Sequence, residues 1–512
     1  MHGETIYQLF RAAAGSQGSK IAISFLRECR VETKISYAQL LEDVDRFANT
    51  LLGIGVQKGD RVILFLPKSL IAVVAHFAVL AVGGIAVPLN PGFTRNEMTY
   101  LLEDSNANLV IIDPEKKSLI LESYPGARLL EVPASGPYQE TGFFRSASGT
   151  LPAIQIAPND PALIIYTSGT TGNPKGAVLT HKNLICDARN IIDIWKIRDS
   201  DVLCHALPLF HVHGLCFALH TVLFSGGRVQ MMAQFKPEVV AEELSRKTGD
   251  TLCTVFMAVP SMYTKLMDFI GDRILDLGHL RLITSGSAPL PISEFECITR
   301  VFGREPVERE GMSETGMNFS NPVDGRRVPG SIGLPLPGVQ VRIVDPRNAI
   351  DVAPGDIGEI WLKSDSITPG YFRKPGETAD AFMDGWFRTG DLGKKDADGY
   401  YYLTDRIKHI IITGGENVSA KEVETIINRI ENVVESAVVG IPDEKWGEKV
   451  VAAVTAKPKA DLTEADIKDF CRANLHAWKC PKHILFIREI PRNTMGKVLK
   501  EEVKKIFAGK LI

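Results

Sequence analysis

Short apolar runs alternate with helix-length amphipathic stretches through the first 150 residues, and this alternation restricts the possible folds more than any other feature. Residues 61–66 and 108–113 are strand-length runs with apolar interiors, while residues 37–52 and 94–103 have helical spacing. Strands that are apolar on both faces are typical of parallel sheets covered by helices. The sequence therefore predicts an α/β fold with a mostly parallel sheet.

The longest apolar run, residues 70–89, is nearly long enough to cross a membrane. His76 interrupts it, Gly83 and Gly84 break it, and Pro88 lies near its end. We therefore expect a buried helix at 70–82 and a buried strand at 85–89, and no membrane span. A second α/β stretch follows farther on, with strands expected near residues 202–206, 228–232, 254–258 and 280–284.

Two segments differ in composition from this alternation of strands and helices. Residues 124–158 are rich in Pro, Gly and Ser, and we expect them to run over the surface. Residues 329–391 are punctuated by Gly and Pro between short β-like runs, which predicts a small barrel or distorted sheet. From about residue 409 the chain is more charged and mixes helical and strand patterns.

Composition narrows the class of protein. The 512 residues are enough for more than one domain, and the net charge of −3 gives no reason to expect binding to nucleic acid or to a membrane surface. The eight cysteines are scattered without a C-x-x-C pair, which argues against a zinc site or disulfide framework and for a reducing compartment. The first residues lack a secretory pattern and the last four are not a standard peroxisomal address, so we expect a cytoplasmic protein.

The segment 166–176 combines hydroxyl-bearing residues, glycines and a single lysine after an apolar run. Glycine lets the backbone approach a ligand closely, and consecutive N–H groups in such a turn form an anion-binding concavity. Lys175 can supply the compensating charge. The spacing is neither that of a Walker loop nor that of the dinucleotide fingerprint. We predict a phosphate-binding loop, with an ordinary surface loop as the alternative.

This segment resembles the phosphate-binding signature of the adenylate-forming family, which contains acyl-CoA synthetases, luciferases and the adenylation domains of peptide synthetases. Further motifs resemble that family in the expected order, at residues 308–314, 385–391, 405–408 and 491–497. The ordered set is far more specific than any single motif.

The resemblance implies a set of ATP- and AMP-binding residues, namely Thr167, Ser168, Gly169, Thr170, Thr171, Gly172, Lys175, Gly286, Ser287, Ala288, Glu310, Ser313, Asp391 and Arg406. Asp391 would bind the ribose, and Ser313 the phosphate of the acyl-adenylate. Glu314 would hold Mg²⁺, because a hard carboxylate can place this ion against phosphate oxygens and so neutralise charge as pyrophosphate leaves. Glu310 stands where the family usually has an aromatic residue that stacks on adenine.

The resemblance also implies roles in catalysis and movement. Lys497 corresponds to the adenylation lysine, Lys408 to the hinge pivot, and Gly414 and Gly415 to the path of pantetheine. His211 matches the residue at the mouth of the acyl pocket. His213 has no such match, and without a third ligand the two histidines are weak candidates for a metal site.

The implied architecture has a large N-terminal domain (1–404) of α/β subdomains plus a small barrel-like β subdomain. A hinge (405–408) and a small mobile α+β C-terminal domain (409–512) follow. The implied reaction has two halves: a carboxylate attacks the α-phosphate of ATP to give acyl-AMP, and CoA then takes the acyl group after the small domain rotates. ATP, CoA and a carboxylic acid would be the partners, and both a monomer and a homodimer stay open.

The acid is harder to predict. Lys265, Ser287 and Arg309 together resemble the malonyl-CoA synthetase branch, in which the matching residues hold the distal carboxylate. Lys265 stands where bacterial members often have Arg, so its charge would be kept without bidentate geometry. The alternative is that Lys265 simply points to solvent. A fatty acid–CoA ligase and a carrier-loading adenylation enzyme remain alternative functions, and a non-catalytic nucleotide binder is disfavoured because Lys175, Glu314, Asp391 and Lys497 are all present.

Overall fold

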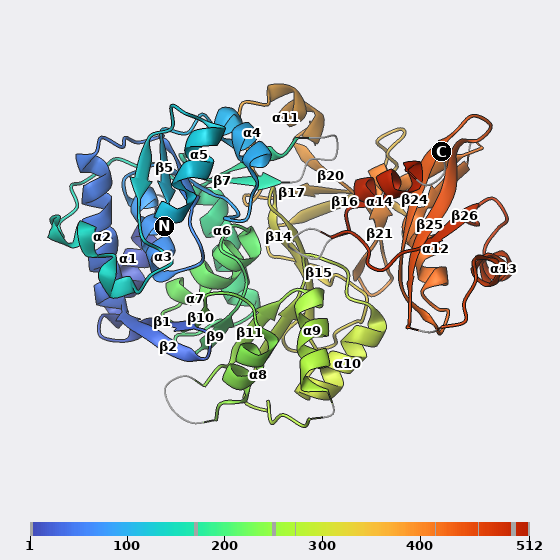
Figure 1. Ribbon diagram of the computed structural model, residues 1–512, viewed down its shortest axis with the longest axis horizontal. Coiled ribbons are helices and arrows are strands. Elements are labelled where there is room, and N and C mark those ends of the chain that lie inside the picture. The colour runs from blue at the N-terminus through green and yellow to red at the C-terminus, as the bar shows by residue number, and fades with distance from the viewer. Residues whose placement is uncertain are drawn as a thin grey trace. The chain divides into compact units, whose positions relative to one another are not determined.

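The computed structural model describes residues 4–167, 173–247, 252–271, 273–414, 416–458, 460–492 and 498–509. The chain divides into two compact units (Figure 1). The larger unit is Met1–Gln340 with Lys363–Phe387, and the smaller is Val341–Leu362 with Arg388–Ile512. The division at residues 405–408 stays a prediction.

The larger unit contains a nine-stranded sheet in the order β15-β14-β13-β12-β11-β9-β10-β1-β2. Its inner strands pair in parallel, and β2, β14 and β15 are antiparallel to their neighbours. The strands expected near 202–206, 228–232, 254–258 and 280–284 are confirmed as β9 to β12, with small shifts at their ends. In chain order the strands are β1 (Ile21–Arg27), β2 (Arg30–Ser36), β9 (Val202–His205), β10 (Arg228–Met232), β11 (Val255–Ala258), β12 (Leu282–Ser285), β13 (Val307–Met312), β14 (Gly316–Ser320) and β15 (Leu334–Pro335).

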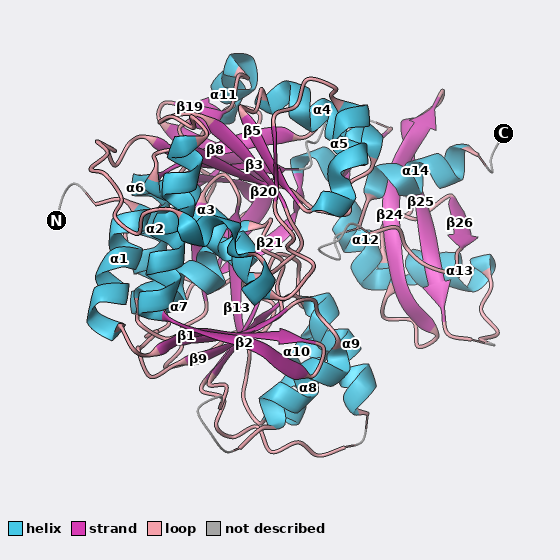
Figure 2. Cartoon of the chain, turned by 60° about the vertical axis from the view of Figure 1, so that its left-hand side comes forward, coloured by secondary structure: helices cyan, strands magenta, loops and turns pink. Residues whose placement is uncertain are grey.

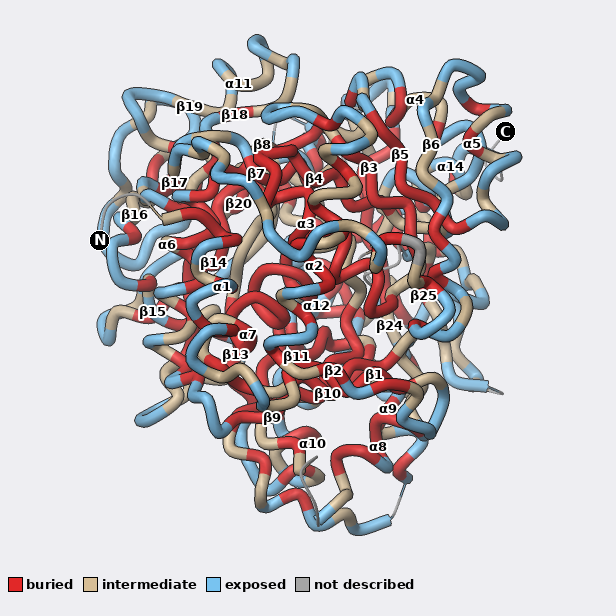
Figure 3. Tube along the Cα trace, turned by 90° about the vertical axis from the view of Figure 1, so that its left-hand side faces the viewer, coloured by how far each residue is buried: buried red, intermediate tan, exposed pale blue. Residues whose placement is uncertain are grey.

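The larger unit also contains a seven-stranded sheet in the order β18-β8-β7-β4-β3-β5-β6. The strands from β7 to β6 are parallel, as the apolar runs predict, whereas β8 and β18 are antiparallel. Their bounds are β3 (Arg61–Phe65), β4 (Ile85–Pro88), β5 (Leu109–Ile112), β6 (Leu129–Glu131), β7 (Pro161–Thr167), β8 (Lys175–Thr180) and β18 (Gly370–Tyr371). Figure 3 shows β3, β4 and β5 buried.

Figure 2 shows a layer of helices between the two sheets. This layer contains α1 (Ile6–Gln17), α2 (Tyr37–Gly53), α3 (Leu70–Ala81), α6 (His181–Ile194), the π-helix η4 (His213–His220) and α7 (Thr221–Phe224). The other helices of the unit are α4 (Arg95–Ser105), α5 (Lys117–Ser123), α8 (Pro237–Ser245), α9 (Pro260–Ile270), α10 (Ile292–Phe302), α11 (Pro375–Ala381) and the 3₁₀ turns η1 (Pro114–Lys116), η2 (Tyr138–Glu140) and η3 (Gly142–Ser146).

Helix α3 is buried along its whole length, because every one of its residues packs inside the helical layer. The Ser69 hydroxyl caps its first turn by accepting from the Ala72 backbone N–H. The prediction of a core helix followed by a buried strand is therefore confirmed. Within the described residues no helix is long and apolar enough to cross a membrane.

The expectation that residues 124–158 run over the surface is partly wrong. Phe144 and Tyr138 are buried, and both pack against α2. The Phe144 ring lies 5.4 Å from that of Phe47, and the Tyr138 hydroxyl donates to Asp43 Oδ2 at 2.5 Å. Aromatic residues dispersed among Gly, Pro and Ser thus anchor the segment, because burying one aromatic ring outweighs the polarity of its neighbours.

The predicted β subdomain is a five-stranded sheet in the order β16-β17-β20-β19 with β21 paired to β20. The smaller unit also contains a sheet in the order β23-β22-β25-β24, with β26 paired to β25. Helices α12 and α13 pack against this sheet in one hydrophobic core, and α14 packs against it in a second one. These elements are β16 (Gln340–Val344), β17 (Gly358–Lys363), β19 (Phe382–Met383), β20 (Trp386–Lys395), β21 (Tyr401–Arg406), η5 (Ile407–His409), β22 (Ile410–Thr413), β23 (Glu416–Ser419), α12 (Ala420–Ile427), β24 (Val433–Asp443), β25 (Gly447–Ala456), α13 (Glu464–Asn474), β26 (His483–Phe486) and α14 (Lys500–Ala508). The mixed composition after residue 409 thus folds as α+β.

Candidate active site

The predicted phosphate loop joins two antiparallel strands. β7 ends at Thr167, β8 begins at Lys175, and these two residues are paired across the sheet. Ser168, Gly169, Thr170, Thr171 and Gly172 lie outside the described residues. The apolar run before the loop is therefore a buried strand, as expected, and the loop returns directly into a second strand.

Glu314 lies beside the start of this loop. It occupies the turn between β13 and β14, where Met312 pairs with Gly316 and leaves Ser313, Glu314 and Thr315 to close the hairpin. Gly316 has a φ of +73°, a conformation that glycine adopts without strain. The Glu314 side chain is only 7% exposed, and its Oε1 lies 3.4 Å from Thr167 Oγ1.

Tyr371, on β18, also reaches Glu314. Its hydroxyl donates to Glu314 Oε1 at 3.1 Å, and its ring lies 5.2 Å from Lys175 Nζ. Burial, reinforced by the Glu314 carboxylate, raises the pKa of the Tyr371 phenol, so this group keeps its proton and remains a donor. Sequence reasoning missed Tyr371, because only the pairing of β18 with β8 brings it close.

Glu314 fits the role of a Mg²⁺ ligand. It is a buried carboxylate beside hydroxyl groups at the phosphate loop, and Mg²⁺ typically takes one or two carboxylates while its other ligands are waters and substrate phosphates. No cluster of three or more His, Cys, Asp or Glu residues that could hold a metal occurs in the described ranges.

A second group of residues gathers where β12 ends. Ser287, which follows Gly286, has a φ of +69°, an uncommon conformation for a residue with a side chain. Its Oγ lies 3.4 Å from Arg309 Nη2 and 3.2 Å from His213 Nδ1. A Cβ at residue 286 would lie 2.5 Å from Arg309 Nε, so glycine there makes room for the guanidinium. We call Ser287, Arg309 and His213 the acid cluster.

Arg309 is buried without a full set of partners. The residue is 4% exposed, its guanidinium lies 5.1 Å from the centre of the Phe217 ring, and its Nε and Nη1 have no hydrogen-bond partner within the described part of the chain. Burial lowers the pKa of Arg309 to about 10, while Glu310 and Asp187 act to raise it. The guanidinium therefore stays charged near neutral pH and keeps two donor nitrogens that have no partner among the described residues.

Both histidines of the segment are neutral. Burial lowers the pKa of His211 to about 4, and lowers that of His213 well below its ordinary value with help from Arg309. His213 begins η4, and the next residue is Gly214. The Pro208 carbonyl oxygen packs against this glycine so closely that a Cβ on residue 214 would lie 2.0 Å from it. A neutral imidazole can orient Ser287 without adding a second positive charge to the acid cluster.

Two other residues of the predicted site, Glu310 and Lys265, lie outside the acid cluster. The Glu310 carboxylate accepts a hydrogen bond from Asn318 Nδ2 at 3.0 Å, so it belongs to a polar network between β13 and β14. Lys265 is exposed on α9, and none of the contacts described for the acid cluster involves it. The structure thus brings Ser287 and Arg309 together and adds His213, which the sequence left unassigned.

The smaller unit holds the predicted ribose ligand. Asp391, on β20, is buried and pairs across the sheet with Arg406 on β21. Its Oδ1 lies 2.5 Å from Arg406 Nε. Burial lowers the pKa of Lys408 to about 8, and the positive charge of the nearby Arg406 contributes to this shift to a smaller extent.

Three residues of the predicted CoA path and adenylation step are also in this unit. Gly414 has a φ of +61°, and its backbone packs so closely on the Trp446 ring that a Cβ would lie 2.8 Å from it. Gly415 and Lys497 lie outside the described residues.

Known proteins resemble this chain over nearly its whole length. Residues 10–372 match the family model of AMP-binding enzymes, and residues 422–497 match the AMP-binding enzyme C-terminal domain. The mitochondrial malonate–CoA ligase of Bos taurus is 35% identical over 94% of this chain and 85% of its own length. The long-chain fatty acid–CoA ligase FadD13 of Mycobacterium tuberculosis is 32% identical over 94% of this chain and 95% of its own. The crystal structure of ATP-bound MatB from Rhodopseudomonas palustris superposes with a TM-score of 0.91, 38% identity, and coverage of 98% of this chain and 99% of that one.

Proposed function

This chain belongs to the AMP-binding enzyme family as an AMP-forming acid–CoA ligase, and on that premise we propose that its acid is malonate or methylmalonate. The observation that supports this choice is the buried guanidinium of Arg309, two of whose nitrogens, Nε and Nη1, have no hydrogen-bond partner among the described residues. Burying a charge without a partner is costly, and a second carboxylate on the substrate would supply the missing partner.

The acid cluster suits a carboxylate better than an alkyl chain. Arg309 offers planar donors to two carboxylate oxygens, and the Ser287 hydroxyl can donate a further hydrogen bond while His213 Nδ1 orients it. A plain fatty acid would leave the guanidinium uncompensated. Sites built around a polar partner reject the analogue that lacks it much more strongly than apolar pockets sort methylene groups.

We propose the following roles in the two half-reactions. The reacting carboxylate attacks the α-phosphorus of ATP, the bond to pyrophosphate breaks, and Lys497 stabilises the developing charge. Lys175 and Thr167 would bind phosphate oxygens, and Tyr371 would orient Glu314 through its 3.1 Å hydrogen bond. Mg²⁺ bound by Glu314 would neutralise phosphate charge.

In the second half-reaction the CoA thiolate attacks the acyl carbonyl and AMP leaves. We propose that Asp391 holds the ribose hydroxyls, that residues 409–512 turn about Lys408 between the half-reactions, and that Gly414 and Gly415 border the pantetheine. His211 would line the mouth of the acyl pocket as a neutral imidazole. A reducing compartment such as the cytoplasm fits the eight free cysteines.

A CoA-dependent AMP-release assay tests the proposal. Malonate, methylmalonate, propionate, butyrate and octanoate are compared by kcat/KM. Malonate or methylmalonate should exceed propionate by roughly a hundredfold or more, which corresponds to about 3 kcal/mol. A preference for butyrate or octanoate would refute the choice of acid. Exchange of pyrophosphate into ATP without any CoA thioester product would indicate a carrier-loading enzyme instead.

A further inference from the structure

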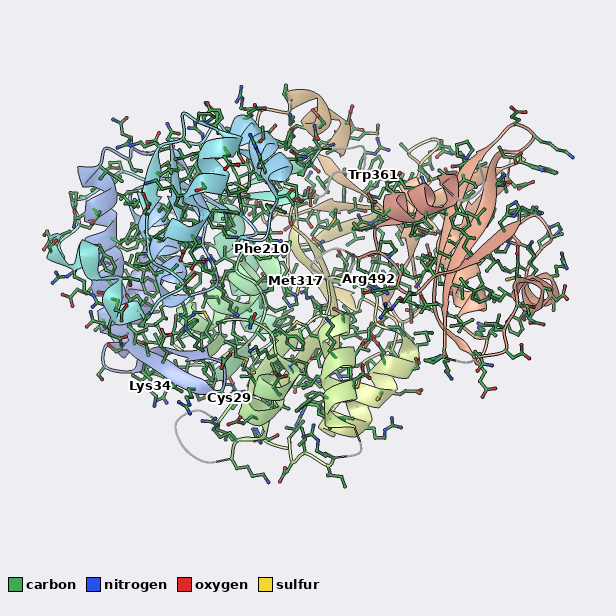
Figure 4. The ribbon with its side chains drawn as sticks, viewed as in Figure 1. Cys29, Lys34, Phe210, Met317, Trp361 and Arg492 are labelled. Carbon is green, nitrogen blue, oxygen red and sulfur yellow. The ribbon has the colours of Figure 1, made fainter. Side chains whose placement is uncertain are left out.

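A carboxylate on α4, Asp104, lies against the strands that flank the predicted phosphate loop. It is in the last turn of the helix, and its side chain is only 6% exposed. Its Oδ2 accepts a hydrogen bond from the Tyr166 hydroxyl at 2.8 Å, and Tyr166 directly precedes Thr167 at the end of β7. Figure 4, in the view of Figure 1, shows side chains filling the space between α4 and β7. Asp104 therefore attaches one end of the loop to the helix.

A second tyrosine attaches the other end of the loop to the same helix. Tyr100 lies one turn before Asp104 on α4, and its hydroxyl donates to the Pro174 carbonyl at 2.9 Å. The same hydroxyl oxygen lies 3.3 Å from Asp104 Oδ1. Pro174 directly precedes Lys175, the first residue of β8. One turn of α4 thus contacts the chain on both sides of the predicted phosphate loop.

The charge of Asp104 is balanced by Lys374. Lys374 Nζ lies 2.8 Å from Asp104 Oδ1, and this lysine follows β18, which pairs with β8. A carboxylate in the last turn of a helix is disfavoured by the helix dipole, and near an anionic ligand it would repel that ligand. The Lys374 ammonium offsets both effects. A carboxylate can therefore hold the strands beside a phosphate site without opposing the binding of phosphate.

The Tyr166 side chain is a fixed proton donor. Burial, reinforced by the hydrogen bond to Asp104, raises the pKa of the Tyr166 phenol, so the hydroxyl keeps its proton. The rings of Tyr166 and Tyr100 pack against one hydrophobic core. Tyr166 is paired across the sheet with Gly176, where a Cβ would lie 3.3 Å from the Tyr166 ring atom Cζ. The position of this hydroxyl is thus set by packing as well as by hydrogen bonding.

We propose that Asp104 is a positioning residue for ATP, because it holds Thr167 and Lys175 where they can bind phosphate oxygens. Thr167 and Lys175 are paired across the sheet, so a shift of either neighbouring residue, Tyr166 or Pro174, would move this pair. Asp104 itself would not contact the nucleotide. Supporting contacts of this kind improve binding by fixing the groups that touch the ligand. This role rests on the proposed function of Thr167 and Lys175 and is independent of which acid the enzyme activates.

Titration calorimetry with ATP plus Mg²⁺, and separately with adenosine, tests the proposal in the absence of acid and CoA. Asp104→Ala should raise the Kd for ATP at least tenfold and the Kd for adenosine less than threefold, because adenosine has no phosphate. Asp104→Asn keeps an oxygen that can accept from Tyr166, so it should weaken ATP binding less than Asp104→Ala does. An unchanged Kd for ATP in Asp104→Ala would overturn the proposal. Equal weakening of ATP and adenosine would also overturn it, since that result indicates a general structural role.

Asp43→Ala is the matched control. Asp43 is a buried carboxylate on α2 that accepts from the Tyr138 hydroxyl at 2.5 Å, so it too joins a helix to a distant tyrosine. Its described hydrogen bonds go to Tyr138 and Gln39, and neither residue belongs to the loop or its flanking strands. Asp43→Ala should change the Kd for ATP less than threefold. An equal effect in Asp43→Ala and Asp104→Ala would contradict a specific role for Asp104.

Lys175→Met distinguishes this role from the proposed function of the loop. It should raise the Kd for ATP at least tenfold by itself. If Lys175→Met weakens ATP binding and Asp104→Ala does not, the role of Asp104 is wrong and phosphate binding by the loop stands. If neither variant weakens ATP binding, both proposals are wrong.

A double variant keeps the test decisive if Asp104→Ala folds poorly. Tyr100→Phe combined with Tyr166→Phe removes both hydroxyls and keeps both rings in the hydrophobic core. This protein should bind ATP at least fivefold more weakly than the wild type, whereas Tyr138→Phe, which loses the hydroxyl facing Asp43, should change the Kd less than twofold. A double variant that binds ATP as tightly as Tyr138→Phe would overturn the proposal.

Discussion

Replacing Arg309 with Met tests the acid cluster directly. Methionine keeps a long side chain against the Phe217 ring but removes the guanidinium, including Nε and Nη1, which have no partner among the described residues. The distal carboxylate of malonate would then enter the cluster without its cationic partner. We expect Arg309→Met to lose malonate activity while keeping weak activity on monocarboxylic acids.

The size of the loss follows from the contacts. A hydrogen bond to a charged group contributes about 1.5–3 kcal/mol. Two such bonds, which are not fully additive, give about 3–4 kcal/mol, so kcat/KM for malonate should fall roughly 160- to 900-fold. Propionate has no distal carboxylate, so its kcat/KM should change by less than about fivefold on the same reasoning. Removing a buried charge whose hydrogen bonds are incomplete should also leave the free energy of unfolding unchanged or higher, by up to about 2 kcal/mol.

The assay is CoA-dependent AMP release with malonate and propionate, together with urea unfolding of both proteins. Lys265→Met is the matched control, because Lys265 is exposed on α9, and its malonate kcat/KM should fall less than about threefold. An Arg309→Met enzyme that still prefers malonate over propionate by a hundredfold would refute the reasoning. So would an equal loss in Lys265→Met.

Four further changes test other parts of the site. Lys497→Ala should reduce the rate of adenylation at least a hundredfold, which is about 2.7 kcal/mol, and should spare thioester formation from supplied acyl-AMP. An equal loss in both half-reactions would contradict the role of Lys497 in adenylation. Glu314→Gln should raise the Mg²⁺ concentration that gives half-maximal ATP–pyrophosphate exchange at least tenfold, and an unchanged Mg²⁺ dependence would remove it as the ligand. Glu310→Tyr should lower the KM for ATP through adenine stacking worth roughly 1–3 kcal/mol. If Glu310 acts instead through its network with Arg309, this variant will change acid selectivity and leave the KM for ATP as it was. Burial raises the pKa of Asp187 to about 7, although the Met317 backbone N–H and Arg309 act to lower it. The folded protein therefore binds this proton more tightly than the unfolded chain does. As a result, the folded protein loses stability as pH rises from about 4 to 7. Asp187→Asn can still accept from Met317, so urea unfolding should show its stability relative to the wild type increasing from pH 5 to pH 8, by roughly 2.6 kcal/mol. A difference that is the same at both pH values contradicts the shift.

Local patterns in the sequence determined the α/β class, most element positions and the order of the motifs. Hydrophobic periodicity depends on which faces of a helix or strand are buried, and that information is written along a few consecutive residues. The helix at 70–82 was predictable because its apolar residues surround the whole helix, and α3 is buried on all sides. Gly316, which begins β14, and Gly414, which lies in a turn, both have positive φ, so their residue type alone indicates a backbone requirement.

Tertiary structure alone decided which distant side chains meet. Tyr371 reaches Glu314 because β18 pairs with β8, and no periodicity in either segment encodes that pairing. His213 joins Ser287 because η4 and the end of β12 come together across 74 residues of sequence, and Lys265 is exposed although its motif suggested otherwise. The incomplete hydrogen bonding of Arg309 likewise appears only in three dimensions. Whether a charge is compensated depends on how deeply it is buried and on its distance from groups that lie far away in the chain. The sequence of one segment shows only that segment's own preference for helix, strand or turn.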